Sequence, residues 1–260
     1  GVQKDKADSQ AQIMFEMEKT LATSQNIQQE NRDPKKTTNL YTVTELEEQF
    51  PAIGWESLRS IPGSGPVSEV NILQPEYLHQ LNTLLETAPT EDWKAYLTYH
   101  LLNEAAPYLN YEYEMADHIF FTRVLQGGGE PEPRSNRVAF STNYLLGDLV
   151  GKVYATKYGN PEQIKEITSI FHAIRQAMHD RIDNLTWMSD SAKAACQIRL
   201  SQMGVRIGYP DKWIDYSGLN LSGSYIGNVR NILTYNLLHG PKGLDKIGKP
   251  LDRSIWFIPP

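Results

Sequence analysis

Histidine and carboxylate side chains are the groups in this 260-residue chain best suited to bind a metal ion or transfer a proton. The sequence contains no His-Glu-x-x-His, the pattern by which one helix supplies two zinc-binding histidines and a general base. Two spacings place a histidine near a second such group on a helix face: His100 with Glu104, and His172 with His179. Two helical turns separate the second pair by about 10 Å, too far for one zinc ion whose bonds are about 2 Å long. We therefore expect no metal-binding residue in this chain.

The single cysteine, the acidic runs and the glycine cluster are weaker candidates. Cys196 lies in an Ala-Ala-Cys-Gln sequence without a neighbouring base, so we expect a packed thiol and not a nucleophile. One cysteine also excludes an internal disulfide. The acidic runs at 45–48 and 111–114 are typical of solvated helix faces, and residues 127–129 lack the Gly-Lys-Ser/Thr of a phosphate loop. The sequence thus predicts no catalytic and no cofactor-binding residue.

The charge of the chain argues against nucleic acid as a partner. Lys and Arg total 25 against 31 Asp and Glu, a net charge of −6, and the basic residues form no stripe. The longest apolar runs are far shorter than the roughly 20 residues of a membrane-spanning helix. The polar start of the chain, Gly1 to Lys4, does not have the pattern of a signal peptide.

Helix signals are frequent along the chain and strand signals are few. Capping boxes are predicted at Ser9–Gln12 and at Thr44–Glu47. Asn160-Pro161 combines an N-cap residue with proline at the first helical position. The helix that follows carries a stripe of apolar residues, typical of a buried core: Ile164, Ile167, Phe171, Ile174, Met178, Ile182 and Leu185. The predicted fold class is mainly α, with many helices and little or no β structure.

Five ordered segments of the chain resemble a known protein family. Their most specific residues are Arg32-Asp33-Pro34, Trp187-Met188, Gly208-Tyr209-Pro210 with Trp213 and Tyr216, and the segment Lys249-Pro250-Leu251-Asp252-Arg253-Ser254-x-Trp256; the helix at 144–158 is the fifth. One Gly-Tyr-Pro alone is weak evidence, but five segments in this order and spacing are not expected by chance. They resemble the neprilysin and endothelin-converting-enzyme family of zinc metallopeptidases, in its non-catalytic N-terminal helical region.

The resemblance implies a lid-type helical domain at residues 1–240 and an inter-lobe linker at 241–260 that ends before the zinc domain. In that family the His-Glu-x-x-His helix and a Glu-x-x-x-Asp helix come later in the polypeptide and hold the zinc. The implied partners are therefore the C-terminal zinc domain of the same polypeptide and the peptide substrates of the intact enzyme. By itself this chain is expected to be an inactive part of a zinc metalloendopeptidase, with zinc present only in the full-length enzyme.

The linker is expected to act as a hinge, because a few residues that absorb backbone rotation suffice for lobe closure. The candidate hinge residues are Pro250, Trp256, Pro259 and Pro260. The alternative function is a stand-alone helical module that binds a peptide or protein without catalysis. Members of this family are commonly secreted, periplasmic or anchored facing outward, so the resemblance favours an extracytoplasmic location over a cytoplasmic one. The lone Cys196 favours a bacterial-type member over the disulfide-rich animal ones.

Overall fold

The structure is a computed structural model that describes residues 3–60, 65–250 and 252–256. Ten α-helices dominate this part of the chain, and its only strands are two of three residues each. The predicted mainly α fold class, with little or no β structure, is confirmed. Across the described ranges, no helix is both long enough and apolar enough to span a membrane. The elements are α1 (Lys4–Ala22), η1 (Glu30–Arg32), α2 (Pro34–Thr37), β1 (Leu40–Thr42), α3 (Val43–Gln49), η2 (Trp55–Ser60), β2 (Glu69–Asn71), α4 (Pro75–Thr87), α5 (Thr90–Ala105), η3 (Ala106–Tyr108), α6 (Tyr111–Asp117), η4 (His118–Leu125), α7 (Arg134–Tyr158), α8 (Pro161–Asp183), α9 (Asp190–Ser201), α10 (Tyr225–His239) and η5 (Leu244–Lys246).

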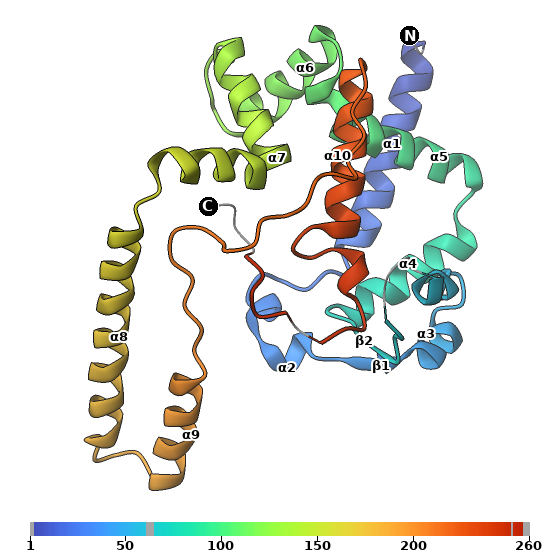
Figure 1. The fold of residues 1–260 in the computed structure, drawn as a ribbon. Helices are drawn as coiled ribbons and strands as arrows, with labels where there is room; N and C mark the ends of the chain where they lie inside the picture. The colour runs from blue at the N-terminus through green and yellow to red at the C-terminus, as the bar shows by residue number, and fades with distance from the viewer. Residues whose placement is uncertain (1–2, 61–64, 251, 257–260) are drawn as a thin grey trace. The chain divides into compact units, whose positions relative to one another are not determined.

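The chain divides into two compact units, and three of its helices lie in the second (Figure 1). Unit 1 contains α1 to α6 and α10, and unit 2 contains α7, α8 and α9. Unit 1 comprises Gly1–Pro131, Leu221–His239 and Gly243–Pro250, and unit 2 comprises Glu132–Asn220, Gly240–Lys242 and Leu251–Pro260. The predicted boundary between a domain at 1–240 and a linker at 241–260 stays a prediction.

The best-packed core of unit 1 lies between α3, α4 and the strand pair. Leu46 and Phe50 are fully buried there, and Trp55 packs against them. The indole nitrogen Nε1 of Trp55 donates to the Phe50 carbonyl oxygen at 3.0 Å, so its polar group is satisfied inside the core. β1 and β2 are antiparallel, with Tyr41 opposite Val70, and both side chains face this cluster. Burial of each large apolar side chain contributes about 1.5–3 kcal/mol, so this cluster is a substantial part of the stability of unit 1.

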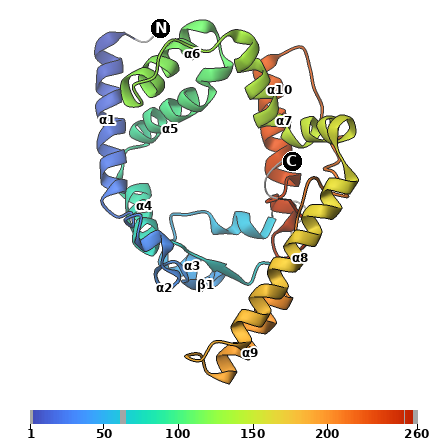
Figure 2. The same ribbon diagram turned by 90° about the vertical axis from the view of Figure 1, so that its left-hand side faces the viewer.

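A second contact in unit 1 joins the N-terminal helix to α5. Figure 2 shows that α1 runs past α5 and α4. The buried residues of α1, Met17 and Leu21, lie in its C-terminal half. Ala95 of α5 is also buried, and a small side chain there lets two helices approach closely. Two distant parts of the chain are thereby held together around apolar contacts.

Two of the predicted helix starts are wrong. Helix α1 begins at Lys4 after Gln3, whose side chain makes no cap bond, so Ser9 lies inside the helix. The second capping box exists but lies two residues earlier: Thr42 Oγ1 accepts from the Glu45 backbone N–H, and Glu45 Oε2 accepts from the Thr42 backbone N–H. The strand that ends at Thr42 sets this start, and Thr44 is already helical. The predicted Asn160 cap is confirmed, since its side-chain oxygen accepts from the N–H groups of Glu162 and Gln163.

The prediction that the α8 stripe is a buried core is wrong for three of its seven members, which are exposed. Ile167, Ile174 and Met178 are 50–61% exposed, whereas Ile164, Phe171 and Ile182 are half-buried. The physical reason is that α9 and the chain after it pack along one edge of α8 only. Among the described residues of unit 2, few apolar side chains are buried, and they include Leu145, Leu200 and Pro210.

The turn after α9 is fixed by a glycine that packs directly on α8. Gly208 has φ +79°, a left-handed conformation that residues with a side chain rarely adopt. A Cβ atom at this position would lie 2.8 Å from Cδ1 of Ile164, at the start of α8. The next residue, Tyr209, contacts the position where Gly159 would carry a Cβ atom. The turn therefore requires glycine both for its backbone and for its close approach to α8.

Replacement of Thr42 by alanine removes the cap of α3 and should lower the free energy of unfolding by about 1 kcal/mol. Urea unfolding followed by circular dichroism measures this, and Thr44→Ala is the matched control, expected to be near neutral. The hydrogen bonds from Thr42 lower the pKa of Glu45. A lowered pKa stabilises the fold above the unfolded pKa, and Thr42→Ala removes only the contribution of the hydroxyl group, because the Thr42 backbone N–H still donates to Glu45. That part of the difference between wild type and Thr42→Ala should be lost as the pH falls through the folded pKa of Glu45. A larger loss from Thr44→Ala than from Thr42→Ala would contradict this assignment.

Replacement of Gly208 by alanine should destabilise the chain by about 1–2 kcal/mol, because the left-handed backbone is strained for a residue with a Cβ atom. Gly204→Ala is the control, since no atom lies within 4 Å of its Cβ position and its backbone is not left-handed. Thermal or urea unfolding of both variants gives the comparison. Equal stabilities of the two variants would show that the turn at Gly208 is not fixed as described.

Candidate functional site

The histidines of the described chain do not gather into a metal site. Over residues 3–60, 65–250 and 252–256, no group of three or more His, Cys, Asp or Glu side chains is placed to hold a metal ion. His172 has a basic neighbour instead of a second ligand, with Arg175 Nη2 3.1 Å from its Nδ1. His179 faces carboxylates of its own helix and not His172. These residues do not fit the zinc that the family uses, so no catalytic step is assigned to them.

His100 pairs with α1 and not with Glu104, four residues along its own helix. Its Nε2 lies 2.8 Å from Oε1 of Glu18, and its ring centroid is 4.3 Å from that of Tyr96. Burial, with a smaller contribution from Glu18, raises the pKa of Tyr96 to about 12. The tyrosine therefore keeps its proton at neutral pH. The group joins α1 to α5 through a polar contact and lacks a nucleophile.

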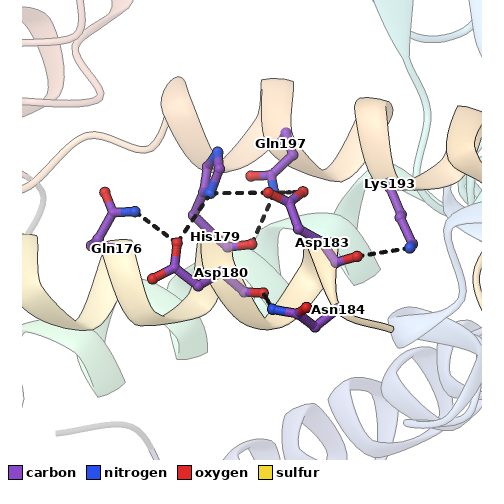
Figure 3. A network of polar contacts seen from close by, with 7 residues as sticks. All are labelled: Gln176, His179, Asp180, Asp183, Asn184, Lys193 and Gln197. Carbon is purple, nitrogen blue, oxygen red and sulfur yellow. Dashed lines mark hydrogen bonds and ion pairs between the residues drawn. The ribbon is translucent and has the colours of Figure 1, made fainter. Parts of the chain in front are cut away.

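The densest polar network of unit 2 joins the C-terminal end of α8 to α9 (Figure 3). Gln197 Nε2 donates to the His179 carbonyl oxygen at 3.0 Å and to Oδ1 of Asp183 at 2.8 Å. Lys193 Nζ donates to the Asp183 carbonyl oxygen at 2.8 Å. The last carbonyl groups of a helix have no partner within it, and a cation near them is favoured by the helix dipole. Two side chains of α9 thus satisfy the exposed end of α8.

Side chains of α8 itself extend this network, which we call the α8–α9 clasp: Gln176, His179, Asp180, Asp183, Asn184, Lys193 and Gln197. Gln176 Nε2 donates to Oδ1 of Asp180 at 2.8 Å, and Asn184 Nδ2 donates to the Asp180 carbonyl oxygen at 2.7 Å. His179 Nδ1 lies 3.5 Å from Oδ2 of Asp183 and 3.6 Å from Oδ1 of Asp180. Each residue of the clasp contacts another of its members, although Gln197 Oε1 is buried without a hydrogen-bond partner. These contacts set the geometry of the hairpin.

The turn of this hairpin exposes a large aromatic side chain. Trp187 is 76% exposed, and Met188 beside it is half-buried. Ser189 then starts α9, because its Oγ accepts from the Ala192 backbone N–H at 3.3 Å. The indole of Trp187 thus lies in the turn between the end of α8 and the start of α9.

The Gly208-Tyr209-Pro210 motif and Trp213 form the base of the same hairpin. The rings of Tyr209 and Trp213 are stacked, with centroids 6.4 Å apart and planes 17° apart, and Pro210 is buried. The next residue, Ile214, donates its backbone N–H to Oδ2 of Asp148 in α7 at 2.8 Å. Burial raises the pKa of Asp148, although this hydrogen bond opposes the shift. Tyr216 lies further along, where its carbonyl oxygen accepts from the Leu219 N–H.

The Arg32-Asp33-Pro34 motif belongs to unit 1 and forms a helix start. Asp33 Oδ1 accepts from the Lys35 backbone N–H at 2.9 Å, and Pro34 occupies the first position of α2. Arg32 ends the preceding turn η1 and is exposed. The structure thus gives Asp33 and Pro34 local roles at the start of α2. Their role as a family signature stays a prediction.

The predicted hinge residues lie where the chain passes between the two units. Pro250 is the last residue of its unit 1 segment, and the half-buried Trp256 belongs to unit 2. Pro259 and Pro260 lie outside the described residues. Before Pro250 the chain is anchored: Gly65 donates its N–H to the Ile247 carbonyl oxygen at 2.7 Å, and a Cβ atom on Gly65 would overlap the carbonyl oxygen of Gly248.

Sequence reasoning missed the residues that hold the structure together over long distances. Glu18, Lys193 and Gln197 are ordinary polar residues on helices, and their partners lie 10 to 82 positions away. A signal existed for Lys193, which follows a helix end closely, because lysine near a helix C-terminus is favoured. No pattern along the chain relates Glu18 to His100.

Comparisons with known proteins give the chain its family. Residues 1–210 match the model of peptidase family M13. A neutral endopeptidase of Lactobacillus helveticus is 24% identical over 100% of this chain and 40% of its own length. Neprilysin-2 of Drosophila melanogaster is 22% identical over 98% of this chain and 36% of its own length.

Solved structures agree with this result. The Mycobacterium tuberculosis zinc metalloprotease Zmp1, in complex with an inhibitor, is 27% identical with a TM-score of 0.89 over 100% of this chain and 39% of that chain. PepO from Lactobacillus rhamnosis has the same fold, with 20% identity and a TM-score of 0.86 over 100% of this chain and 41% of that chain. The chain therefore spans about two fifths of the length of these relatives. The predicted resemblance to the neprilysin-like metallopeptidases is confirmed, and because the family model covers most of its length, the chain belongs to peptidase family M13.

Proposed function

We propose that this chain is the non-catalytic helical domain of a zinc metalloendopeptidase that cleaves peptides and small proteins. The observation that carries the proposal is the match of the whole chain to 39% of Zmp1, a zinc metalloprotease. The described residues of this chain contain no group able to hold a metal. Zinc and the catalytic residues would therefore belong to the rest of the polypeptide, which is the partner of this domain together with the peptide substrate.

The role of the domain in this proposal is to enclose the substrate cavity and to restrict substrates by size. Such selection is steric and needs no reactive side chain. The clasp and the Gly208 turn support this role, because a wall that excludes large substrates has to keep its shape. The alternative is a stand-alone peptide-binding module. Measurements of zinc content and peptide cleavage on the full-length protein distinguish the two functions.

We propose further that the chain between Pro250 and Trp256 acts as a hinge between this domain and the rest of the polypeptide. The support is that the segment before Pro250 is anchored within unit 1, where Gly65 packs against Gly248 and donates its N–H to the Ile247 carbonyl oxygen. Zmp1 has been solved in an open state and in a partially open state, so a relative of similar fold changes its degree of opening. A rotation concentrated in a few residues is the usual origin of such motion.

The proposed location is extracytoplasmic: periplasmic, secreted or on the cell surface. This proposal rests only on the usual location of the members of the family and stays a prediction. Fractionation of cells that express the natural gene would test it.

Zinc content and peptide cleavage should distinguish the 260-residue chain from the full-length gene product. We expect about one zinc ion per molecule and cleavage of a quenched fluorescent peptide library by the full-length protein only, because the described residues lack a metal site. Elemental analysis and fluorescence give the two readouts. Stoichiometric zinc or cleavage by the 260-residue chain would overturn the proposal, and His172→Ala and His179→Ala would then locate the site. A full-length protein that lacks both would favour the binding module.

Replacement of Pro250 by alanine in the full-length enzyme should change the rate of opening, because proline restricts the backbone at the proposed hinge. We expect kcat/KM for a small protein substrate to change more than kcat/KM for a short peptide, since the larger substrate needs the wider opening. Lys249→Ala is the neighbouring control. If Pro250→Ala leaves both substrates unaffected, the hinge does not lie at this residue.

A further inference from the structure

One face of α8 is apolar, regular and uncovered. We call it the α8 apolar face and define it by Ile167, Ile170, Ala173, Ile174, Ala177 and Met178, all of which are exposed. Its four large side chains are 50–61% exposed. An apolar patch of this kind that is exposed to solvent is typical of a site where another protein surface binds.

Helix geometry shows why this face remains open. Successive residues are about 100° apart around an α-helix, so Ile174 and Met178 lie within about 20° of Ile167. Ile164 and Ile182 lie about 60° to one side, where they are half-buried by the Gly208 turn and α9. Ile170 lies about 60° to the other side and is exposed. The contact with α9 thus covers one edge of a wider apolar stripe and leaves the centre and the far edge open.

The shape and the charge of the α8 apolar face indicate the chemistry of its partner. Ala173 and Ala177 lie beside the isoleucines and let another backbone approach closely. α8 carries four acidic and three basic side chains, so neither sign dominates: Glu162, Glu166, Asp180 and Asp183 against Lys165, Arg175 and Arg181. Anionic surfaces such as nucleic acid or charged lipid are recognised by clusters of Lys and Arg. The face therefore suits an apolar protein surface.

We infer that the α8 apolar face packs against the part of the polypeptide that M13 relatives carry outside the region matched by this chain. This inference rests on the proposed function and identifies the surface through which the two parts of the protein meet. The chain spans only 36–40% of the length of these relatives, so each of them carries a large further surface in its own polypeptide. The face lies within the residues that match the family model. Such a contact would also stabilise unit 2, because the few buried apolar side chains among its described residues, such as Leu145, Leu200 and Pro210, make a small core.

Thiol labelling at the centre of the face tests this inference. Ile174→Cys, made in a Cys196→Ser background, is compared in the 260-residue chain and in the full-length gene product, with modification by a maleimide measured at that peptide by mass spectrometry. We expect labelling at least about tenfold slower in the full-length protein, the factor that corresponds to an opening cost of roughly 1.4 kcal/mol. Ser169→Cys, on the opposite face of α8, is the matched control and should react equally in both. Circular dichroism confirms that each variant is folded.

The outcomes separate this inference from the proposed function. Equal labelling of the Ile174→Cys thiol in both proteins would overturn the inference, even if the full-length protein binds zinc and cleaves peptides. Slow labelling in a full-length protein without zinc or cleavage would support the docking face and reject the proposed enzyme.

Two other binding partners of the α8 apolar face would each contradict the inference. A second copy of the chain would slow labelling of the 260-residue chain as its concentration rises, together with dimers in sedimentation. A lipid surface would slow labelling when vesicles of phosphatidylcholine and phosphatidylglycerol are added. We expect neither effect.

Discussion

The packing of α9 along one edge of α8 is the contact on which the rest of unit 2 depends. Gln197 and Lys193 hold the carbonyl end of α8, and the Gly208 turn closes against Ile164 at its other end. Both ends of α8 are therefore fixed by chain that follows it. Because these contacts are polar at one end and sterically tight at the other, they fix an orientation as well as a distance. A helix that is held in this way presents its remaining face in one defined direction.

The two units differ in how they obtain stability. Unit 1 has an aromatic and aliphatic cluster around Phe50. Unit 2 has elongated helices whose apolar side chains are mostly open, including Trp187 at the tip of the hairpin. Hydrophobic burial is the main favourable contribution to folding, so a unit of this kind is more stable when a further surface covers it. This is the behaviour expected of one part of a larger enzyme, and it agrees with a chain that spans about two fifths of its relatives' length.

Local features of the fold could be predicted from the sequence, and distant contacts could not. The Asn160 cap and the helix after it follow from residues that are neighbours in the chain. The α3 cap was placed two residues late because the strand ending at Thr42, which decides the helix start, pairs with β2 about 30 residues away. The apolar period of α8 was recognised, but a period does not tell which protein surface covers a stripe. Family membership was evident from short motifs, whereas the clasp, built from Gln197 and Lys193, has no sequence signature.

Reconstitution from two pieces tests most directly whether this chain is a necessary, non-catalytic part of a metallopeptidase. The 260-residue chain and the separately produced remainder of the gene product would be mixed, and cleavage of a fluorescent peptide and of a small protein would be followed against each piece alone. The account predicts that zinc stays with the remainder and that size-limited cleavage appears only in the mixture. A remainder that alone cleaves both substrates with the rate and size limit of the intact protein would contradict it.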